Sequence, residues 1–353
     1  SSVHSEGRAA RSIVEDARRA VAAFVNGRPE HVVFTSGATE AATTLLTPDW
    51  QMGRAALRMG RLYVCEADHP CLLSGGRFPA GQVARIGVGG DGILDLATLE
   101  AALAAHNKGD GLPLVAIHAA NNETGVIQPV DAISRIVKAA GGVLVLDAVQ
   151  AAGRIPLDIS AGSVDYLILS SHKIGGPKGA GAVVAAADLM MPKPLVAGGG
   201  QEKGHRAGTE NLPAVAGFGA AARQALAALE AIEAVRARRD GIEAMISELV
   251  PDAVFFGADA PRLPNTSFFA IPGMKAETAQ IAFDLASVAL SAGSACSSGK
   301  VGPSHVLKAM GVGAGQGALR VSIGQVTTDE DIGLFRTALA GIAARRAGGK
   351  QAA

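Results

Sequence analysis

The feature that most constrains this chain is a short apolar run that passes directly into a lysine-bearing, glycine-rich turn. Residues 165–169 have the length and composition of a buried strand, and the sequence SSHKIGGPKG follows at 170–179. Such a strand places the amine of Lys173 at the rim of an α/β sheet, where ligands usually bind. An amine partly withdrawn from water can form a Schiff base with an aldehyde cofactor. The alternative is a surface lysine in a turn, and this segment alone does not decide between the two.

A second apolar run, Val143–Leu146, ends in Asp147. An aspartate in this position is commonly a helix cap or a solvated turn residue. At a pyridoxal phosphate site the carboxylate has a defined task, because it holds the proton on the pyridine nitrogen and keeps the ring an electron sink. The stretch between Asp147 and Lys173 has room for one crossover and one strand. Parallel strands would therefore bring both residues to the same edge of the sheet.

Two more predicted strands are followed by polar residues that could bind a ligand. His31–Thr35 leads into a small-residue turn and a helix whose start, with the Thr39 hydroxyl, would suit a phosphate. Leu114–His118 leads into the sequence NNETG at 121–125, whose amides could hydrogen-bond a ligand or form an Asx turn. Each signal is weak alone, but a series of strand ends with different polar groups indicates a ligand site.

The apolar positions alternate between helical and strand periods along most of the chain. Arg8–Val25 is predicted to be an amphipathic helix that stops at Asn26-Gly27. Strand–helix alternation then continues to about Val196, which is the signature of a mostly parallel sheet with helices on both faces. A long alanine-rich helical stretch, Leu212 to Val250, follows with a predicted break near Asp240.

The C-terminal part has the pattern of a smaller α+β domain. Three runs in it read as strands, namely Ala253–Phe256, Asn265–Phe269 and Leu319–Ser322. Its last helix is predicted to start at Thr327, because Thr327 and Glu330 have capping-box spacing.

Composition indicates a soluble enzyme and excludes several other classes of protein. Lys+Arg and Asp+Glu both total 32, so a broad nucleic-acid or anionic-membrane surface is not expected. Hydrophobic residues make up 48% of the chain, but no apolar run approaches the roughly 20 residues of a membrane span. The chain opens without a basic and apolar signal segment. We therefore expect a cytoplasmic protein with neither nucleic acid nor membrane as a partner.

The chain has three cysteines, Cys65, Cys71 and Cys296. Their odd number and unpaired spacing argue against a disulfide framework, and no cysteine–histidine cluster in the sequence predicts a metal site. Cys65 and Cys71 are expected to be packing residues. Cys296 lies in the small, polar run 291–299, which suits an exposed and mobile thiol that approaches a substrate.

Several segments, in order and spacing, resemble those of group I cysteine desulfurases of the NifS/IscS type. They are SGATEA, EADHP, NNETG, DAVQ, SSHKIGGPKG, GGGQEKGHRAGTEN and SAGSACSSG. These enzymes are class V aminotransferase-like, fold-type-I pyridoxal phosphate enzymes, and the resemblance extends to about Asp331. It implies an α/β fold, with a cofactor-binding large domain at 1–229 and a small α+β domain at 230–353 that carries the cysteine loop. By the same resemblance, the opening segment of the family is absent.

The resemblance implies roles in the reaction for five residues. Lys173 would hold the cofactor and shuttle protons, and His69 would stack on the ring and act in acid–base chemistry. Cys296 would be the nucleophile that takes the sulfur. Asn122 and Arg320 would hold the substrate carboxylate. For Arg320 the alternative is a structural salt bridge, because a guanidinium in a strand-like run is costly unless it is paired.

Other residues would bind pyridoxal 5'-phosphate itself. Asp147 would pair with the pyridine nitrogen, and Gln150 would hydrogen-bond the phenolic oxygen. The phosphate would be bound by residues after two strand ends and by one residue from a partner subunit: Ala38, Thr39, Ser170, His172 and the partner's Thr209.

The expected activity is conversion of L-cysteine to L-alanine, with transfer of the sulfur to an enzyme persulfide. A homodimer would then deliver sulfur to an iron–sulfur scaffold protein or another sulfur acceptor. One alternative is a related pyridoxal phosphate lyase or aminotransferase, of the selenocysteine lyase or kynureninase type, which would share Lys173, Asp147 and His69 without needing Cys296. The other is an inactive truncated scaffold, since the opening segment is absent.

Overall fold

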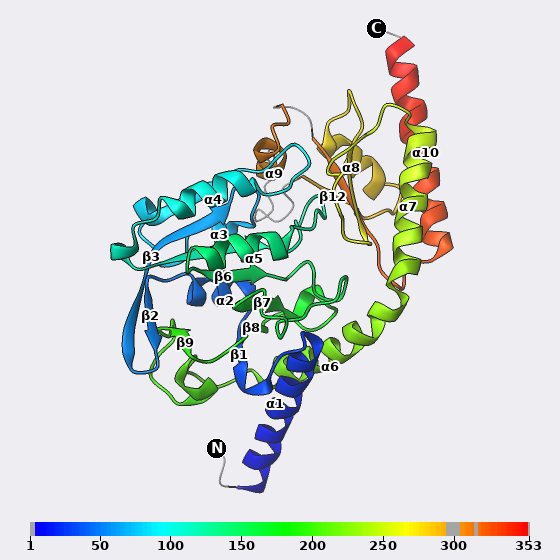
Figure 1. Cartoon of the computed structure of the whole chain (residues 1–353). Coiled ribbons are helices and arrows are strands. Elements are labelled where there is room, and N and C mark those ends of the chain that lie inside the picture. Colours follow the sequence, from blue (N-terminus) through cyan, green and yellow to red (C-terminus); the bar gives the residue numbers. More distant parts are fainter. Residues whose placement is uncertain (1–3, 294–303, 314–316, 352–353) are drawn as a thin grey trace. The chain divides into compact units, whose positions relative to one another are not determined.

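A computed structural model describes residues 4–293, 304–313 and 317–351, and the chain divides into two units (Figure 1). The first unit is Ser1–Gly87, Leu94–Ala120 and Gln128–Leu229, and the second is Val88–Ile93, Asn121–Ile127 and Glu230–Ala353. The expected large domain, 1–229, differs from the first unit by the two short segments 88–93 and 121–127. The second of these joins the second unit through backbone hydrogen bonds from Ile127 to Pro261 and from Leu263 to Gly125.

The described part of the first unit contains a nine-stranded sheet. The order is β1 (Val32–Thr35), β8 (Gly181–Ala185), β7 (Tyr166–Ser170), β6 (Val143–Asp147), β5 (Leu112–His118), β3 (Ala55–Cys65), β2 (Asp49–Met52) and β9 (Met190–Pro192), with β4 (Val83–Ile86) also paired to β3. Strands β3 to β7 of this order pair in parallel, and β8 is antiparallel to both β7 and β1. The carboxyl ends of β1, β3, β5, β6 and β7 therefore lie at one edge of the sheet.

The central strands are buried along their whole length, as the sequence runs predict. Every residue of β6, β7 and β8 is buried, which is typical of strands covered on both faces. Alternate residues such as Val143 and Val145 pack in one apolar cluster with Ala41 of helix α2 (Ala38–Leu45) and Leu72 of helix α3 (Pro70–Leu73). Asp147 continues that alternation, so its side chain lies on the face of the sheet that α2 and α3 cover.

Helices of the first unit connect the strands and cover the sheet. They are α1 (Ser5–Phe24), α2 (Ala38–Leu45), α3 (Pro70–Leu73), α4 (Leu96–Ala104), α5 (Val130–Ala139) and α6 (Leu212–Ala228). Short 3₁₀ helices occur at Pro29–His31, Ala80–Gln82, Lys108–Asp110, Ser171–Lys173, Gln201–Gly204 and Leu229–Ala231. The predicted first helix is confirmed, and it ends where Asn26 takes a left-handed φ of 51°.

The second unit contains a four-stranded antiparallel sheet and four helices within its described residues. The strand order is β10 (Val254–Phe255), β11 (Thr266–Ala270), β13 (Leu319–Ser322) and β12 (Ser291–Ala292). The helices are α7 (Ile232–Leu249), α8 (Ala276–Asp284), α9 (His305–Ala309) and α10 (Asp329–Gln351). Its core includes the stacked rings of Phe283 and Phe335, with centroids 5.4 Å apart. The three predicted strands of this part are confirmed.

Two predicted helix boundaries are wrong. The long helical stretch breaks at Leu229–Ala231, whereas Asp240 lies inside α7, where its carboxylate accepts a hydrogen bond from Arg239 at 2.7 Å. The capping box of the last helix is one residue later than predicted. Thr328 and Asp331 form it reciprocally, because each backbone N–H donates to the other side chain, at 2.8 and 3.1 Å.

One helical stretch in the described residues, Leu212–Leu249, is long and apolar enough by composition to cross a membrane. It comprises α6, a 3₁₀ turn and α7, so it is not one continuous helix. Helices α1 and α6 lie side by side in the first unit (Figure 1), and a Cβ at Gly219 of α6 would lie 2.5 Å from Ala17 of α1. Only glycine at this position allows the two helices to approach so closely.

Candidate active site

The turn from β1 into α2 lies against the start of β8. Gly181 of β8 is in register with Ser170 of β7, and a Cβ at Gly181 would lie 2.6 Å from the Gly37 carbonyl carbon. Only glycine permits this approach, which brings the start of α2, with Ala38 and Thr39, to the end of β7. The structure thus places these predicted phosphate-binding residues beside one another.

Hydrogen-bonding groups gather at this corner of the sheet edge. The positive end of the α2 dipole is here, and Ser170 Oγ lies 2.9 Å from His172 Nδ1. Partial burial, with the positive charges of Lys173 and Lys178, lowers the pKa of His172. At neutral pH His172 is therefore a neutral imidazole beside two cationic amines. A helix start with a hydroxyl, an imidazole and nearby amines is suited to binding an anion such as phosphate.

Lys173 and Asp147 lie at the ends of two adjacent strands. Lys173 is half-buried and ends the 3₁₀ turn after β7, and Asp147 is the last residue of β6. The two strands pair in parallel, with Asp147 in register with Ile168. The sequence expectation that both residues come to one sheet edge is therefore met.

Asp147 is buried, and its Oδ1 accepts a hydrogen bond from the Val149 backbone N–H at 3.0 Å. Burial raises the pKa of Asp147 to about 6, and the negative charge of Asp68 adds to this effect. The Val149 bond and the positive charge of Lys173 act in the opposite direction. A carboxyl group with this proton affinity is suited to share a proton with a ring nitrogen.

Arg154 joins two turns of the candidate site. Its Nη1 donates to the Gln150 carbonyl at 2.7 Å, and its Nη2 donates to the Lys173 carbonyl at 3.3 Å. The half-buried Gln150 is thereby tied to the lysine turn. Sequence reasoning missed Arg154, because an arginine in a loop between two strands carries no pattern that marks its partners.

His69 follows β3 at the same sheet edge. It caps the short helix α3, and its Nδ1 accepts the Cys71 backbone N–H at 3.2 Å, which sets the orientation of the ring. Cys71 is buried, as expected for a packing residue, and burial with the charges of Asp147 and Asp68 raises the pKa of its thiol. Burial also raises the pKa of Cys65. Both thiols are therefore poor candidates for a nucleophile.

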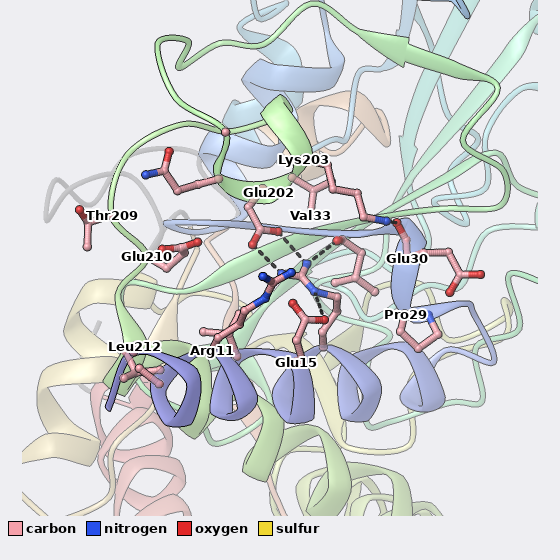
Figure 2. Close-up of a pocket in the computed structure, with 17 residues that line it drawn as sticks. Arg11, Glu15, Pro29, Glu30, Val33, Glu202, Lys203, Thr209, Glu210 and Leu212 are labelled. Carbon is pink, nitrogen blue, oxygen red and sulfur yellow. Dashed lines mark hydrogen bonds and ion pairs between the residues drawn. The ribbon is translucent and has the colours of Figure 1, made fainter. Parts of the chain in front are cut away.

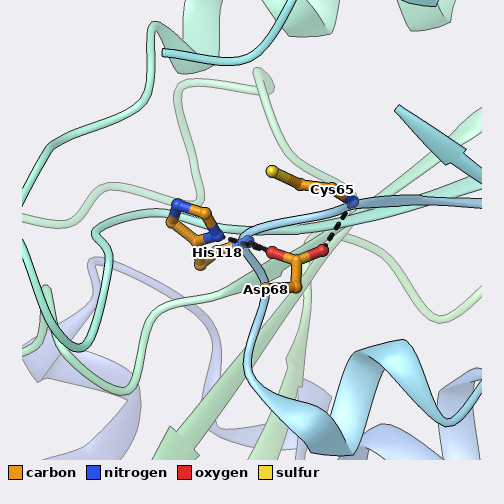
Figure 3. Close-up of side chains that lie close together, drawn as sticks. All are labelled: Cys65, Asp68 and His118. Carbon is orange, nitrogen blue, oxygen red and sulfur yellow. Dashed lines mark hydrogen bonds and ion pairs between the residues drawn. The ribbon is translucent and has the colours of Figure 1, made fainter. Parts of the chain in front are cut away.

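A buried cluster that the sequence did not reveal connects these strand ends (Figure 3). Asp68 lies between the backbone of Cys65 and the ring of His118, with 2.5 Å between Asp68 Oδ1 and His118 Nδ1. Side-chain ligand atoms of these three residues lie within 4.8 Å of one another. His118 was visible only as the last residue of a predicted strand, and Asp68 only as the neighbour of His69.

In the second unit, Arg320 and Asn122 lie together, as expected. Arg320 projects from β13, and its guanidinium donates to the Asn122 carbonyl and, at 3.2 Å, to Ser291 Oγ. Its Nε is buried, with no hydrogen-bond partner among the described residues. The part of the chain that the structure describes includes no salt bridge to Arg320. A carboxylate ligand would satisfy the Nε donor.

Two predicted site residues need separate comment. Cys296 lies outside the described residues. Thr209 is exposed, and with Ser36 and Gly179 it lines a cavity of 220 Å³. The loop that carries Thr209 also borders a larger cavity of 790 Å³ above α1, where Glu202 points towards that helix (Figure 2).

The donors of the first unit suit pyridoxal 5'-phosphate. Asp147 would hold the ring nitrogen, Lys173 the aldehyde carbon, and the α2 start with Ser170 and His172 the phosphate. The observation behind this fit is the burial of the Asp147 carboxyl group, which raises its pKa and leaves its negative charge poorly solvated. A protonated ring nitrogen would stabilise that charge.

Comparison with known proteins agrees with this fit. A cysteine desulfurase of Cereibacter sphaeroides is 38% identical over 343 residues, which cover 94% of this chain and 85% of that protein. The X-ray structure of a NifS-like protein from Rickettsia africae ESF-5 matches with a TM-score of 0.84 and 31% identity, covering 97% of this chain and 91% of its own. A structure of SspA in complex with cysteine matches with a TM-score of 0.71 and 25% identity, covering 93% and 91%.

The family model described as aminotransferase class-V matches residues 1–335, a range that includes the lysine turn, the Asp147 strand and Arg320. The match therefore includes the candidate residues of both units. The chain belongs to the class-V aminotransferase family.

Proposed function

We propose that this chain is a pyridoxal phosphate-dependent cysteine desulfurase that converts L-cysteine to L-alanine and transfers the sulfur to Cys296. The observation that carries the proposal is the pair of Asp147 and Lys173 at the ends of adjacent parallel strands. Class-V aminotransferases are pyridoxal phosphate enzymes, and the relatives named cysteine desulfurase are similar over nearly the whole chain. The neighbour that binds cysteine supports L-cysteine as the substrate.

When bound, the cofactor supplies an electron sink that makes the substrate Cα proton acidic. Lys173 would hold the cofactor, and its amine would also serve as the base that moves the proton from Cα. Asp147 keeps a proton at the ring nitrogen, which its raised pKa favours. His69, oriented by the Cys71 N–H, is placed to donate or accept a proton.

Arg320 and Asn122 bind the substrate carboxylate in this proposal. The buried Nε of Arg320 gives the guanidinium a donor for one carboxylate oxygen. The thiolate of Cys296 attacks the substrate sulfur, so that an S–S bond forms as the Cβ–S bond breaks. The electron pair of the broken bond stays on Cβ, which takes up a proton. L-cysteine and the enzyme thiol thereby give L-alanine and an enzyme persulfide.

The assembly and the sulfur acceptor are further parts of the proposal. The protein acts as a homodimer in which Thr209 of each chain completes the phosphate site of the other. The persulfide then delivers its sulfur to an iron–sulfur scaffold protein or another acceptor in the cytoplasm. The exposure of Thr209 supports the first part, since it leaves the hydroxyl accessible to a second chain.

The proposal is tested by measuring alanine from L-cysteine with the wild-type protein, Lys173→Ala and Lys193→Ala, in the presence of a thiol reductant that releases the persulfide sulfur as sulfide. We expect the wild-type protein and Lys193→Ala each to form one sulfide per alanine at similar rates, because Lys193 is an exposed lysine outside the candidate site. Lys173→Ala should lose turnover and the borohydride-reducible link to the cofactor. Turnover of L-kynurenine or L-selenocysteine without turnover of L-cysteine would instead identify a related lyase.

A further inference from the structure

His118 is a buried histidine that the reaction proposed above does not use. It is the last residue of β5, and both its ring nitrogens have partners. Nδ1 lies 2.5 Å from Asp68 Oδ1, and Nε2 lies 3.1 Å from Gln128 Nε2. All three side chains are buried, with exposures of 4% for His118, 0% for Asp68 and 3% for Gln128. Such a chain of buried polar groups is costly unless every donor meets an acceptor.

The position of the His118 proton follows from Gln128. The amide oxygen of Gln128 accepts the Leu94 backbone N–H at 2.9 Å, which leaves its nitrogen facing His118. An amide nitrogen can only donate, so His118 Nε2 must be the acceptor and carry no proton. The single ring proton is then on Nδ1, where it is donated to Asp68.

Asp68 in turn shapes the turn that precedes His69. Its Oδ2 accepts the Cys65 N–H at 2.7 Å, and its Oδ1 accepts the His118 backbone N–H at 2.8 Å (Figure 3). The backbone N–H of Asp68 also donates to the Cys65 carbonyl at 3.0 Å. One carboxylate thus connects the ends of β3 and β5, and the residue that follows it is His69.

The same cluster lies beside the cofactor-binding carboxylate. His118 and Asp147 are register partners in the parallel strands β5 and β6, so their side chains lie on the same face of the sheet. The negative charge of Asp68 also acts on Asp147 and raises its pKa. A shift of Asp68 would therefore alter both the His69 turn and the charge near Asp147.

We propose that His118 is a positioning residue: with its one ring proton on Nδ1, it fixes the Asp68 carboxylate and, through it, the turn that presents His69. Neither His118 nor Asp68 touches the reacting atoms in this account. The inference about the proton is independent of the proposed desulfurase activity, whereas the effect on turnover depends on it.

A metal ion is the competing occupant of this cluster, because Cys65, Asp68 and His118 could each supply a ligand atom. A metal would need a lone pair on His118 Nδ1 and a thiolate on Cys65. The hydrogen bond to Asp68 places a proton at the first position, and burial raises the pKa of Cys65. The hydrogen-bonded arrangement therefore explains the geometry without an ion.

The direct test is nitrogen NMR of the cofactor-loaded protein with ¹⁵N-labelled histidine at pH 7.5. His118 should show a protonated Nδ1 and an unprotonated Nε2. His106 is an internal control of opposite type, because its Nε2 donates to the Gly111 carbonyl at 2.9 Å and its Nδ1 faces the Tyr63 hydroxyl at 3.1 Å. A protonated Nε2 on His118, with or without a proton on Nδ1, would overturn the proposal, and so would a metal-bound ring.

A second test compares His118→Asn with His118→Leu. The asparagine amide nitrogen occupies nearly the position of Nδ1 and can still donate to Asp68, whereas leucine cannot. We expect His118→Leu to lower kcat for L-cysteine by about 10- to 100-fold with little change in KM, and to alter the circular dichroism of the bound cofactor. His118→Asn should restore most of both signals. Equal loss in the two folded variants would contradict the role, and the NMR result stands even if His118→Leu does not fold.

Discussion

The carboxyl group of Asp147 is buried, and burial raises its pKa from 3.8 to about 6. Between these two pH values the folded protein binds more protons than the unfolded chain. The free energy of unfolding therefore falls as the pH rises through this range. At pH values well above this pKa Asp147 is fully ionised, and the cost of burying its charge is complete. In the proposed function this charge is retained because it stabilises the protonated ring nitrogen of the cofactor.

Asp147→Asn should therefore stabilise the cofactor-free protein while it impairs the enzyme. The expected gain is about 3 kcal/mol above pH 6 and falls towards zero near pH 4, since the amide carries no charge to bury. Urea unfolding of the cofactor-free wild type and variant at pH 4, 6 and 8 measures this. If the variant is no more stable than the wild type at pH 8, the buried charge of Asp147 does not destabilise the folded protein, and this prediction is wrong.

The sequence identified residues whose local context is distinctive and missed those whose partners are distant. Lys173 and Asp147 follow apolar runs, so their place at the sheet edge could be predicted from the strands alone. Asp68 and His118 lie 50 positions apart, and only the pairing of their strands reveals the contact. The same holds for Arg154, whose two acceptors lie on separate turns.

At the scale of elements, a buried ion pair fastens the loop before Thr209 to α1 and β1. Glu202 accepts two hydrogen bonds from Arg18, at 2.7 and 2.6 Å, and a third from the Phe34 N–H at 2.8 Å. Glu202 and Lys203 have left-handed φ values of 45° and 55°, a conformation that is strained for both residues. The ion pair accounts for how the loop holds this backbone shape.

Removing one partner of this ion pair should destabilise the protein, because the other partner is left as a buried and unpaired charge. Arg18→Met is expected to destabilise the protein by about 3–5 kcal/mol, because it leaves the Glu202 carboxylate buried and unpaired. Arg19→Met on the same helix is the matched control: it breaks an exposed ion pair with Asp16, worth at most about 1 kcal/mol. Denaturant unfolding of both variants measures the two losses of stability. Equal losses would mean that the buried ion pair of Arg18 stabilises the protein no more than the exposed pair of Arg19.

Element types were easier to predict than element ends. The buried strands were evident because continuous apolar runs are typical of parallel strands covered on both faces. The break at Leu229–Ala231 and the one-residue shift of the capping box to Thr328 were not, because neighbouring residues have similar propensities and tertiary packing selects between them. The segment Asn121–Ile127 lies in the second unit because of backbone bonds to distant residues, which leave no mark in the local sequence.

For the whole molecule, the account requires two chains. The 35.5 kDa protein should migrate in sizing experiments as a species of twice that mass, because Thr209 is proposed to complete the phosphate site of its partner. Mixing Lys173→Ala with Thr209→Ala should restore activity, since one site of the mixed dimer has both residues intact. A fully active single chain would contradict this assembly, and so would no recovery in mixtures shown to exchange subunits.

The central claim is that sulfur leaves L-cysteine for the thiol of Cys296. One turnover with ³⁵S-labelled L-cysteine, without reductant, tests it in the wild type, Cys296→Ser and Cys71→Ser. The account predicts one labelled persulfide on Cys296 for each alanine in the wild type and in Cys71→Ser, because Cys71 is a buried thiol with a raised pKa. Cys296→Ser should bind cofactor and substrate yet form neither product. Alanine formed by Cys296→Ser at the wild-type rate, or label found on Cys71, would contradict the claim.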